Sequence, residues 1–235
     1  IRSERLAAVG TLAAGVAHEF NNLNVGILGF AELALGRTDL DPDTRTCFDR
    51  IRSAARRGRD MTEGLLGFSR ARGGQRTRGN LRPVVSETVD LVWRQLQQAG
   101  MDLEMRLHPV PDTFMDRSQI GQVILNLLLN ARHAMTGRPL KQLTIETDSR
   151  DKRVAVRVQD TGCGIAPESL PHLFTPFYST RGGEGVGGSG TGLGLSVSRM
   201  IAENHGGALE VESAVGVGTR FTLWLPAAEA AAGDA

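Results

Sequence analysis

The sequence predicts an all-α helical hairpin that pairs with a second copy into a dimeric four-helix bundle, followed by an α/β layered domain. Three observations predict this order. Apolar residues near the N-terminus recur at steps of three and four, helices alternate with short strands after residue 80, and 14 of the 29 glycines lie between residues 162 and 218. The expected boundaries are a hairpin over 1–72, a linker over 73–80, the α/β domain over 81–227 and a disordered tail over 228–235.

The composition excludes several classes of protein. With 27 basic and 26 acidic residues the net charge is +1, which argues against a nucleic-acid-binding surface. The apolar runs fall well short of the roughly 18 residues of a membrane-spanning helix, and no signal peptide is expected. Cys47 and Cys163 lie far apart and form no metal or disulfide pattern, which favours a reducing compartment. We expect a cytoplasmic core, attached to a membrane only through segments upstream of this chain.

The first helix carries an apolar seam. From Leu6 to Ala34 its steps alternate between three and four residues without a miss, a period of about 3.5 that is typical of helical bundles. Gly36 is expected to cap this helix, and Asp41-Pro42 to start a second helix whose seam runs from Cys47 to Phe68. One hairpin cannot bury both seams, so pairing with a second copy is expected. The alternative is a monomeric hairpin packed on the rest of the chain.

A histidine stands out on this helix because it is not part of the seam. If Leu6 is position a of the heptad, His18 falls at position f, the outermost one. Glu19 is adjacent and Asn22 shares its face. An exposed imidazole is a nucleophile near neutral pH, and the carboxylate can take the proton from its other nitrogen. Taken alone, a His-Glu pair is an ordinary surface feature. The HExxH metalloprotease pattern fails because position 22 is Asn.

The second domain is expected to alternate helices and mostly antiparallel strands. Periodicity predicts helices over 82–98, 117–135 and about 192–205, and strands at 101–107, 112–115, 140–148, 153–160, 208–213 and 218–225.

Two motifs in this domain suit a nucleotide and its metal ion. Asn126 and Asn130 lie one turn apart on the polar face of the 117–135 helix, and amide oxygens suit a Mg²⁺ whose other ligands are phosphate and water. Asp160 ends a strand, where its carboxylate can accept from an exocyclic amine such as that of adenine. Gly162 and Gly164 follow it and let a ring approach the backbone. Each motif taken alone also has a purely structural explanation, the first as a polar helix face and the second as a turn.

A glycine-rich segment opens the last helix. Gly190 to Gly194 would expose backbone N–H groups to an anion at a helix N-terminus. The P-loop is excluded because no Lys follows, and a dinucleotide-binding fold would need the glycines directly after a first strand. Eight of the thirteen residues from Gly182 to Gly194 are Gly, which predicts a mobile lid, although a simple flexible loop has the same composition. The rings of Phe174 and Phe177 are expected to anchor its near end.

Together and in this order, the motifs resemble the sensor histidine kinases of two-component signalling. The boxes of that family correspond to 18–22 (H box), 126–130 (N box), 160–164 (G1), 174–177 (F box), 190–194 (G2) and the last glycine motif at 216–219. The resemblance spans about residues 4–226. It implies a dimerisation and histidine-phosphotransfer hairpin followed by an ATP-binding α/β sandwich of the Bergerat (GHKL) type.

The resemblance also implies roles for individual residues. His18 is the phosphoacceptor, Glu19 the general base, and Asn22 the residue that supports a phosphatase reaction. Asn130, with Asn126 beside it, holds Mg²⁺ against the triphosphate of ATP. The implied ATP-binding positions are Asn126, Asn130, His133, Asp160, Gly162, Gly164, Phe174, Phe177, Arg181, Gly190, Thr191, Gly192, Leu193, Gly194 and Thr219. Two of them depart from the usual residue, since His133 and Arg181 stand where many relatives carry Lys.

The implied activity is autophosphorylation on His18 and transfer to an aspartate of a separate response-regulator receiver domain, with a phosphatase activity toward that regulator. Two alternatives stay open. One is an ATP-binding module that docks a regulator without kinase turnover, against which the intact Glu19 and Asn130 argue. The other is a different GHKL ATPase, which would lack the upstream hairpin and would carry a catalytic Glu on the 117–135 helix, where this chain has none.

Overall fold

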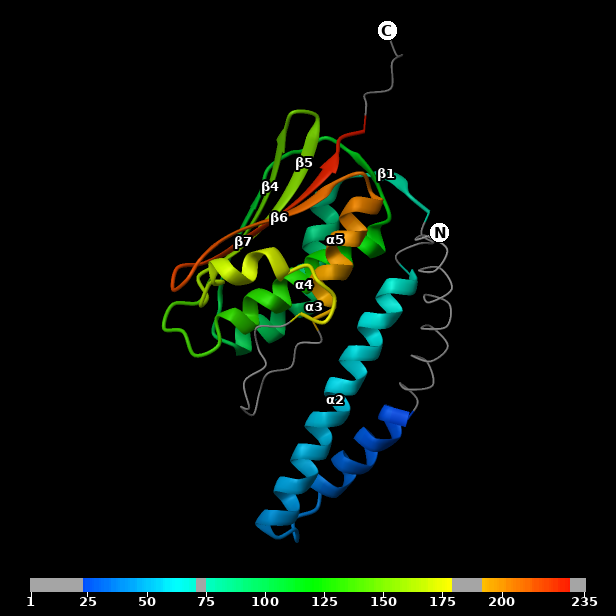
Figure 1. Ribbon diagram of the computed structural model, residues 1–235, viewed down its shortest axis with the longest axis vertical. Helices are drawn as coiled ribbons and strands as arrows, with labels where there is room; N and C mark the ends of the chain where they lie inside the picture. The colour runs from blue at the N-terminus through cyan, green and yellow to red at the C-terminus, as the bar shows by residue number, and fades with distance from the viewer. Residues whose placement is uncertain (1–22, 71–74, 179–191, 229–235) are drawn as a thin grey trace. The chain divides into compact units, whose positions relative to one another are not determined.

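A computed structural model describes residues 23–70, 75–178 and 192–228 of the chain. These residues form two compact units, each of which is considered by itself (Figure 1). The first contains a helix over 23–35, helix α2 (Pro42–Arg70) and the short segments 175–178 and 192–194. The second contains residues 75–174 and 195–228. Among the described residues, no helix combines the length and the apolar character needed to cross a membrane.

The turn between the two helices is held by polar side chains. Asp41 caps α2, because its Oδ1 accepts from the N–H groups of Asp43 (3.1 Å) and Thr44 (2.9 Å). Gly36 directly follows the first helix, as its predicted cap position requires, although it does not adopt a left-handed conformation. Arg45 satisfies two carbonyl groups at this end by donating to the oxygens of Leu35 (3.3 Å) and Arg37 (2.7 Å).

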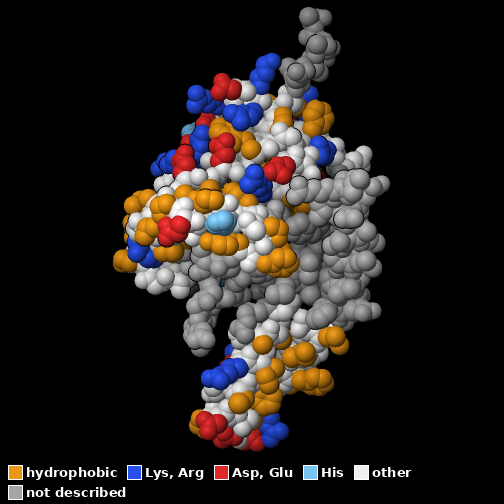
Figure 2. All heavy atoms as spheres, viewed as in Figure 1, with side chains coloured by type: hydrophobic (Ala, Val, Ile, Leu, Met, Phe, Trp, Pro, Cys, Tyr) orange, Lys and Arg blue, Asp and Glu red, His pale blue; other side chains and the backbone are white. Residues whose placement is uncertain are grey.

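The predicted seam is exposed in the single hairpin. Contact between the two helices runs along a neighbouring stripe, where Ala31 and Ala55 are buried and Asn24 lies against Gly58. Gly58 makes this approach feasible, because a Cβ there would lie 2.8 Å from Asn24 Nδ2. The seam residues Leu23, Ile27, Phe30 and Ile51 are open to solvent, and Figure 2 shows apolar side chains gathered along this part of the hairpin. The hairpin therefore leaves an apolar surface uncovered.

The second unit is built on a mixed five-stranded sheet with the order β2-β4-β5-β7-β6. Its strands are β2 (Asp102–Leu107), β4 (Gln142–Arg150), β5 (Arg153–Asp160), β6 (Ala208–Ala214) and β7 (Gly218–Pro226). Each lies within two residues of its predicted position. The β2–β4 pair is parallel and the other neighbours are antiparallel. A separate antiparallel pair joins β1 (Thr77–Gly79) to β3 (Thr113–Met115), so part of the segment expected as a linker is a strand of this unit.

Helices α3 (Leu81–Gln98), α4 (Arg117–Ala134) and α5 (Gly194–Asn204) cover one face of this sheet (Figure 1). Asn80 and Asp116 cap α3 and α4 by accepting from N–H groups of the first turn. The apolar face of α4, with Ile124, Leu127 and Leu128, is fully buried, as its sequence pattern predicts. A 3-10 helix, η1 (Pro167–His172), was not expected.

His205 connects the end of α5 to the start of α4. Its Nδ1–H donates to the carbonyl oxygen of Ile201 (2.7 Å), and its Nε2 accepts from the N–H of Asp116 (3.1 Å). This arrangement requires the neutral ring. Burial lowers the pKa of His205, with Arg76 lowering it further and Asp116 raising it.

We expect acid to destabilise the second unit through His205. As pH falls below about 6.5 the unfolded chain binds a proton that the folded ring resists, so the free energy of unfolding decreases. Between pH 7 and 5.5, the free energy of unfolding should decrease more in wild type than in His205→Gln in denaturant titrations. His108→Gln, which removes an exposed ring, is the matched control and should follow wild type. Parallel pH dependences of wild type and His205→Gln would contradict this assignment.

Candidate active site

The site centres on Asp160, the last residue of β5. Strand alternation turns its carboxylate toward the helix-covered side of the sheet, and the residue is only 4% exposed. Gly162 N–H donates to Oδ1 (2.8 Å). Burial raises the pKa of Asp160 to about 6, although the N–H groups of Gly162 and Thr219 act in the opposite direction. The chain therefore holds a desolvated carboxylate that is ready to accept from a donor on a ligand.

Glycines around Asp160 are required by close backbone contacts. At Gly164 (φ +70°) a Cβ would lie 2.0 Å from the carbonyl oxygen of Ala214, and at Gly218 (φ +138°) it would lie 1.9 Å from that of Asp160. At Gly162 it would meet the Cβ of Ala134 at 2.6 Å. The loop after β5, the β6–β7 turn and the end of α4 therefore pack backbone against backbone.

Ser213 joins these segments and was missed in the sequence. Its hydroxyl accepts from Ile165 N–H (2.9 Å), donates to Gly218 O (2.9 Å) and lies 2.8 Å from the Thr219 hydroxyl. Thr219 pairs with Asp160 across β5 and β7, so the predicted Thr219 lies beside the predicted Asp160. No local pattern distinguishes Ser213 from other strand serines; only its place opposite Thr219 does.

The two asparagines of α4 lie one turn apart and are half-buried. Asn126 Nδ2 donates to Ser198 Oγ of α5 (3.3 Å), which orients the amide and turns Oδ1, the atom that can bind a metal ion, the other way. The described residues hold no cluster of three or more His, Cys, Asp or Glu side chains. Amide oxygens that complete their shell with phosphate and water fit Mg²⁺ as a nucleotide-borne ion.

His133 and the two phenylalanines flank the predicted site. His133 is half-buried at the end of α4, with its Nε2 3.4 Å from Arg132 Nη2. The Phe174 ring packs under the Arg199 guanidinium at 5.1 Å, and Phe177 is 62% exposed. The expectation that both rings anchor the glycine-rich segment stays a prediction, because residues 179–191 lie outside the described residues.

The backbone of Phe177, rather than its ring, joins the two ends of the 179–191 segment. Its N–H donates to Gly192 O (3.0 Å), and a Cβ on Gly192 (φ +66°) would lie 2.5 Å from the Phe177 carbonyl carbon. Leu193 is buried and Gly194 begins α5. The remaining predicted site residues lie outside the described residues: His18, Glu19, Asn22, Arg181, Gly190 and Thr191.

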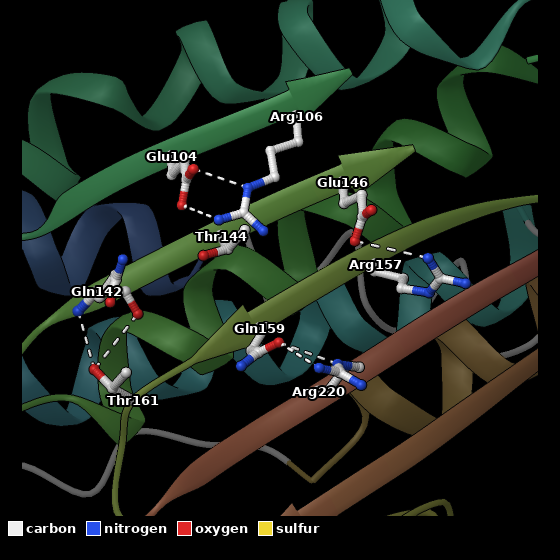
Figure 3. A pocket seen from close by; sticks show the side chains of 9 residues that line it. All are labelled: Glu104, Arg106, Gln142, Thr144, Glu146, Arg157, Gln159, Thr161 and Arg220. Atoms are coloured by element: carbon white, nitrogen blue, oxygen red, sulfur yellow. Dashed lines mark hydrogen bonds and ion pairs between the residues drawn. The ribbon is translucent and has the colours of Figure 1, made fainter. Parts of the chain in front are cut away.

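A polar hollow on the other face of the sheet is distinct from this site (Figure 3). Its arginines already have acceptors: Arg106 binds Glu104 (2.8 Å), Arg157 lies 3.7 Å from Glu146, and Arg220 donates to Gln159 (2.8 Å). Positive and negative side chains neutralise one another there, so the hollow lacks the excess of donors that a phosphate needs.

Two family models match the chain in succession. Residues 8–74 match the "His Kinase A (phospho-acceptor) domain", and residues 115–229 match the "Histidine kinase-, DNA gyrase B-, and HSP90-like ATPase". The chain belongs to the sensor histidine kinases. The order of domains is that of a two-component kinase core, so the predicted hairpin and GHKL α/β fold are confirmed.

Relatives of this kinase core include ZraS of Salmonella typhimurium, 35% identical over 96% of this chain and 47% of ZraS, and AtoS of Escherichia coli, 35% identical over 96% of this chain and 36% of AtoS. The chain thus spans about half the length, or less, of these curated relatives. Among solved structures it is similar to full-length ShkA in complex with AMPPNP (25% identical, TM-score 0.72, 95% of this chain and 47% of that chain). It is also similar to ThkA in complex with the response regulator TrrA (26% identical, TM-score 0.66, 97% and 64%).

Proposed function

We propose that this core binds ATP with Mg²⁺, phosphorylates its own His18 and passes the phosphoryl group to an aspartate of a response-regulator receiver domain. The observation that carries the proposal is the buried Asp160 carboxylate, enclosed by glycines in a domain that follows a phospho-acceptor hairpin. Neighbours solved with AMPPNP and with a response regulator support the same ligand and partner. The proposed boundaries are a hairpin over 1–72 and an ATP-binding domain up to residue 227 that includes β1, so that the linker is shorter than the expected 73–80.

Asp160 selects adenine over other nucleobases. Its carboxylate accepts from the exocyclic amine of adenine, which a 6-oxo purine lacks, and Gly162 and Gly164 let the ring lie against the backbone. Thr219 pairs with Asp160 across β5 and β7, where its hydroxyl can contact the same base. Gly190, Gly192 and Gly194, with Thr191 and Leu193, direct N–H groups toward the phosphates at the start of α5. His133 and Arg181 add contacts there.

The transfer itself is a nucleophilic substitution at phosphorus. One ring nitrogen of His18 attacks the γ-phosphorus in line, the bond to the β–γ bridging oxygen breaks, and ADP leaves with that electron pair. Glu19 takes the proton from the other ring nitrogen. When bound, Mg²⁺ neutralises charge on the triphosphate, and Asn130 and Asn126 are the residues that would hold it. A carboxylate oxygen of the regulator's aspartate then attacks the same phosphorus, the P–N bond breaks, and its electron pair returns to the His18 nitrogen.

Asn22 gives the same hairpin a second proposed reaction, the hydrolysis of the regulator's phosphoaspartate. It lies four residues after His18 on the same helix face, where an amide can hydrogen-bond and orient an attacking water.

Incubation of the dimeric chain with γ-labelled ATP and Mg²⁺ tests the kinase. We expect acid-labile labelling in wild type and none in His18→Ala, while both bind ATP with equal affinity, because His18 attacks the nucleotide but does not hold it. Asn22→Ala should keep the label and lose only regulator dephosphorylation. Equal labelling of wild type and His18→Ala would overturn the proposal, and release of free phosphate without a labelled protein would favour a hydrolytic GHKL ATPase.

The exposed seam supports a homodimer through the hairpin, since Phe30 and its seam neighbours Leu23 and Ile27 are open to solvent in the described part of the hairpin. We expect Phe30→Glu to weaken dimerisation at least about 100-fold, because it places two charges in an apolar interface. Val25 is the matched control: it is 64% exposed against 75% for Phe30 but falls at heptad position f, as His18 does. Val25→Glu should remain dimeric in sedimentation experiments. If both variants, or neither, dissociate, the seam is not the interface.

A further inference from the structure

Arg138 lies outside every motif of the kinase family, in the loop between α4 and β4, yet it contacts the region around Asp160. Its Nη2 donates to the carbonyl oxygen of Gly216 in the β6–β7 turn (2.8 Å), 78 residues away in sequence. Its Nε is buried and has no hydrogen-bond partner among the described residues, although the residue as a whole is half-buried.

The bond from Arg138 closes a ring of hydrogen bonds around the loop that follows Asp160. Cys163 N–H donates to Ala134 O (3.0 Å), which ties this loop to the end of α4. Gly216 N–H donates to Cys163 O (2.8 Å), which ties the turn to the loop. Arg138 binds Gly216, and its own N–H donates to Met135 O (3.1 Å), which returns the ring to α4.

The side chains of the β6–β7 turn do little to hold it in place. Val215 and Val217 are 65% and 71% exposed, and Gly216 (φ +80°) has open space around it. The turn is therefore positioned by backbone contacts, such as that of Ala214 with Gly164, and by hydrogen bonds. A charge-assisted bond from a guanidinium is the strongest kind available to a backbone carbonyl.

The position of the β6–β7 turn also affects the orientation of the Asp160 carboxylate. Cys163, whose carbonyl accepts from the turn, is the neighbour of Gly162, whose N–H donates to the Asp160 carboxylate (2.8 Å). Gly164, on the other side, already lies against Ala214 of β6. A shift of the turn therefore moves the peptide groups that orient the carboxylate.

We propose that Arg138 is a positioning residue for adenine recognition, which holds the loop 161–164 in its binding conformation by clamping Gly216. It acts through the backbone, and its effect is confined to the base end of the nucleotide. The proposal rests on the proposed ATP site, and it assigns to that site a determinant that the conserved boxes do not contain.

The test compares nucleotide affinities of the dimeric chain by calorimetry. Arg138→Met keeps an apolar stem but removes the donor, and we expect it to weaken ATP and ADP equally, by about tenfold, which is the value of one charge-assisted hydrogen bond. Arg138→Lys restores a donor and should recover most of the affinity. In autophosphorylation, Arg138→Met should raise the half-saturating ATP concentration with the maximal rate within about twofold of wild type.

A pH profile separates positioning from a general loss of structure. Loss of the Gly162 N–H bond would raise the pKa of Asp160 further, so the acid limb of ATP binding should move to higher pH in Arg138→Met and not in Arg138→Lys. Arg106→Met, which breaks an exposed pair on the open face of the sheet, is the control and should match wild type.

Three results decide the outcome. Equal affinities of Arg138→Met and wild type, or equal losses in Arg138→Met and Arg138→Lys, would overturn the positioning role. A loss for ATP much larger than for ADP would overturn it as well, because it would place Arg138 at the phosphates. A wild-type chain that binds no ATP would contradict the proposed function instead, and so the two failures are distinguishable.

Discussion

Replacing Asp160 by Asn is expected to abolish useful ATP binding while the second unit stays folded. The buried carboxylate is the acceptor for the adenine amine, and an amide offers a weaker, uncharged acceptor whose NH₂ group can face the ligand. We expect about a 100-fold loss of affinity, in line with a charge-assisted bond lost in a desolvated site. Calorimetric titration with ATP measures it.

Without nucleotide, Asp160→Asn should be at least as stable as wild type, although it binds ATP more weakly. Because the pKa of Asp160 is raised to about 6, ionisation at neutral pH costs stability, on the order of 3 kcal/mol at most. Asp160→Asn removes that cost, so its melting temperature at pH 7.5 should equal or exceed that of wild type. A large drop in melting temperature would show that the carboxylate is structural.

The pH dependence of ATP affinity follows from the same group. As pH falls through 6 the carboxyl group gains a proton and the charged acceptor is lost, so affinity should decrease by up to about tenfold per pH unit. The contribution of Asp160 to the free energy of unfolding without nucleotide has the opposite pH dependence. It rises as pH falls from 7 toward 4, because in this range the folded state binds more protons than the unfolded state. Asp160→Asn should lack both dependences.

The second large effect is expected for Gly164→Ala. A Cβ there would lie 2.0 Å from the carbonyl oxygen of Ala214, which is backbone and cannot rotate away. Gly100 (φ +69°) is a matched control, because it has the same left-handed conformation as Gly164 (φ +70°) but nothing within 4 Å of its Cβ position. We expect about 1 kcal/mol of destabilisation for Gly100→Ala and more than about 3 kcal/mol for Gly164→Ala.

Chemical denaturation of both variants measures the difference, and ATP titration shows its consequence. Gly164→Ala should lose nucleotide binding even where it remains folded, because the loop must separate from β6. Similar destabilisation of the two variants would show that conformational strain, rather than the close contact, is what requires glycine at this position.

Much of the fold could be predicted because its signals are local. The 117–135 helix is found at Arg117–Ala134, since its apolar spacing reports one buried face. The first helix ends at the predicted Gly36, but the contact that satisfies its last carbonyl groups comes from Arg45, eight residues beyond Arg37, and no local signal shows it. Residues 77–79 look like a linker because they are polar, and only their partner strand makes them β1.

In the candidate site, too, some residues could be predicted from local patterns and others depend on tertiary contacts. Spacing made Asn126, Asn130, Asp160 and the glycines candidates, the resemblance to histidine kinases joined them into a set, and the structure brings Asp160, Gly162, Gly164 and Thr219 together. The predicted roles of His18, Glu19 and Asn22 stay predictions. Ser213, Ser198 and Arg138 were not predicted, because each contributes through hydrogen bonds to residues that are not its neighbours in sequence.

The sequence by itself determined the order of the domains and the glycine-rich character of the segments expected near the nucleotide, and its heptad phase predicts that His18 lies off the seam. These properties depend on the spacing of residues along the sequence, which does not change when distant segments pack together. The tertiary structure decided that the Asp160 carboxylate is buried and weakly acidic, and that a ring of hydrogen bonds from Ala134 to Arg138 surrounds its loop. Desolvation and strand register arise only when distant segments pack, and no local pattern encodes them.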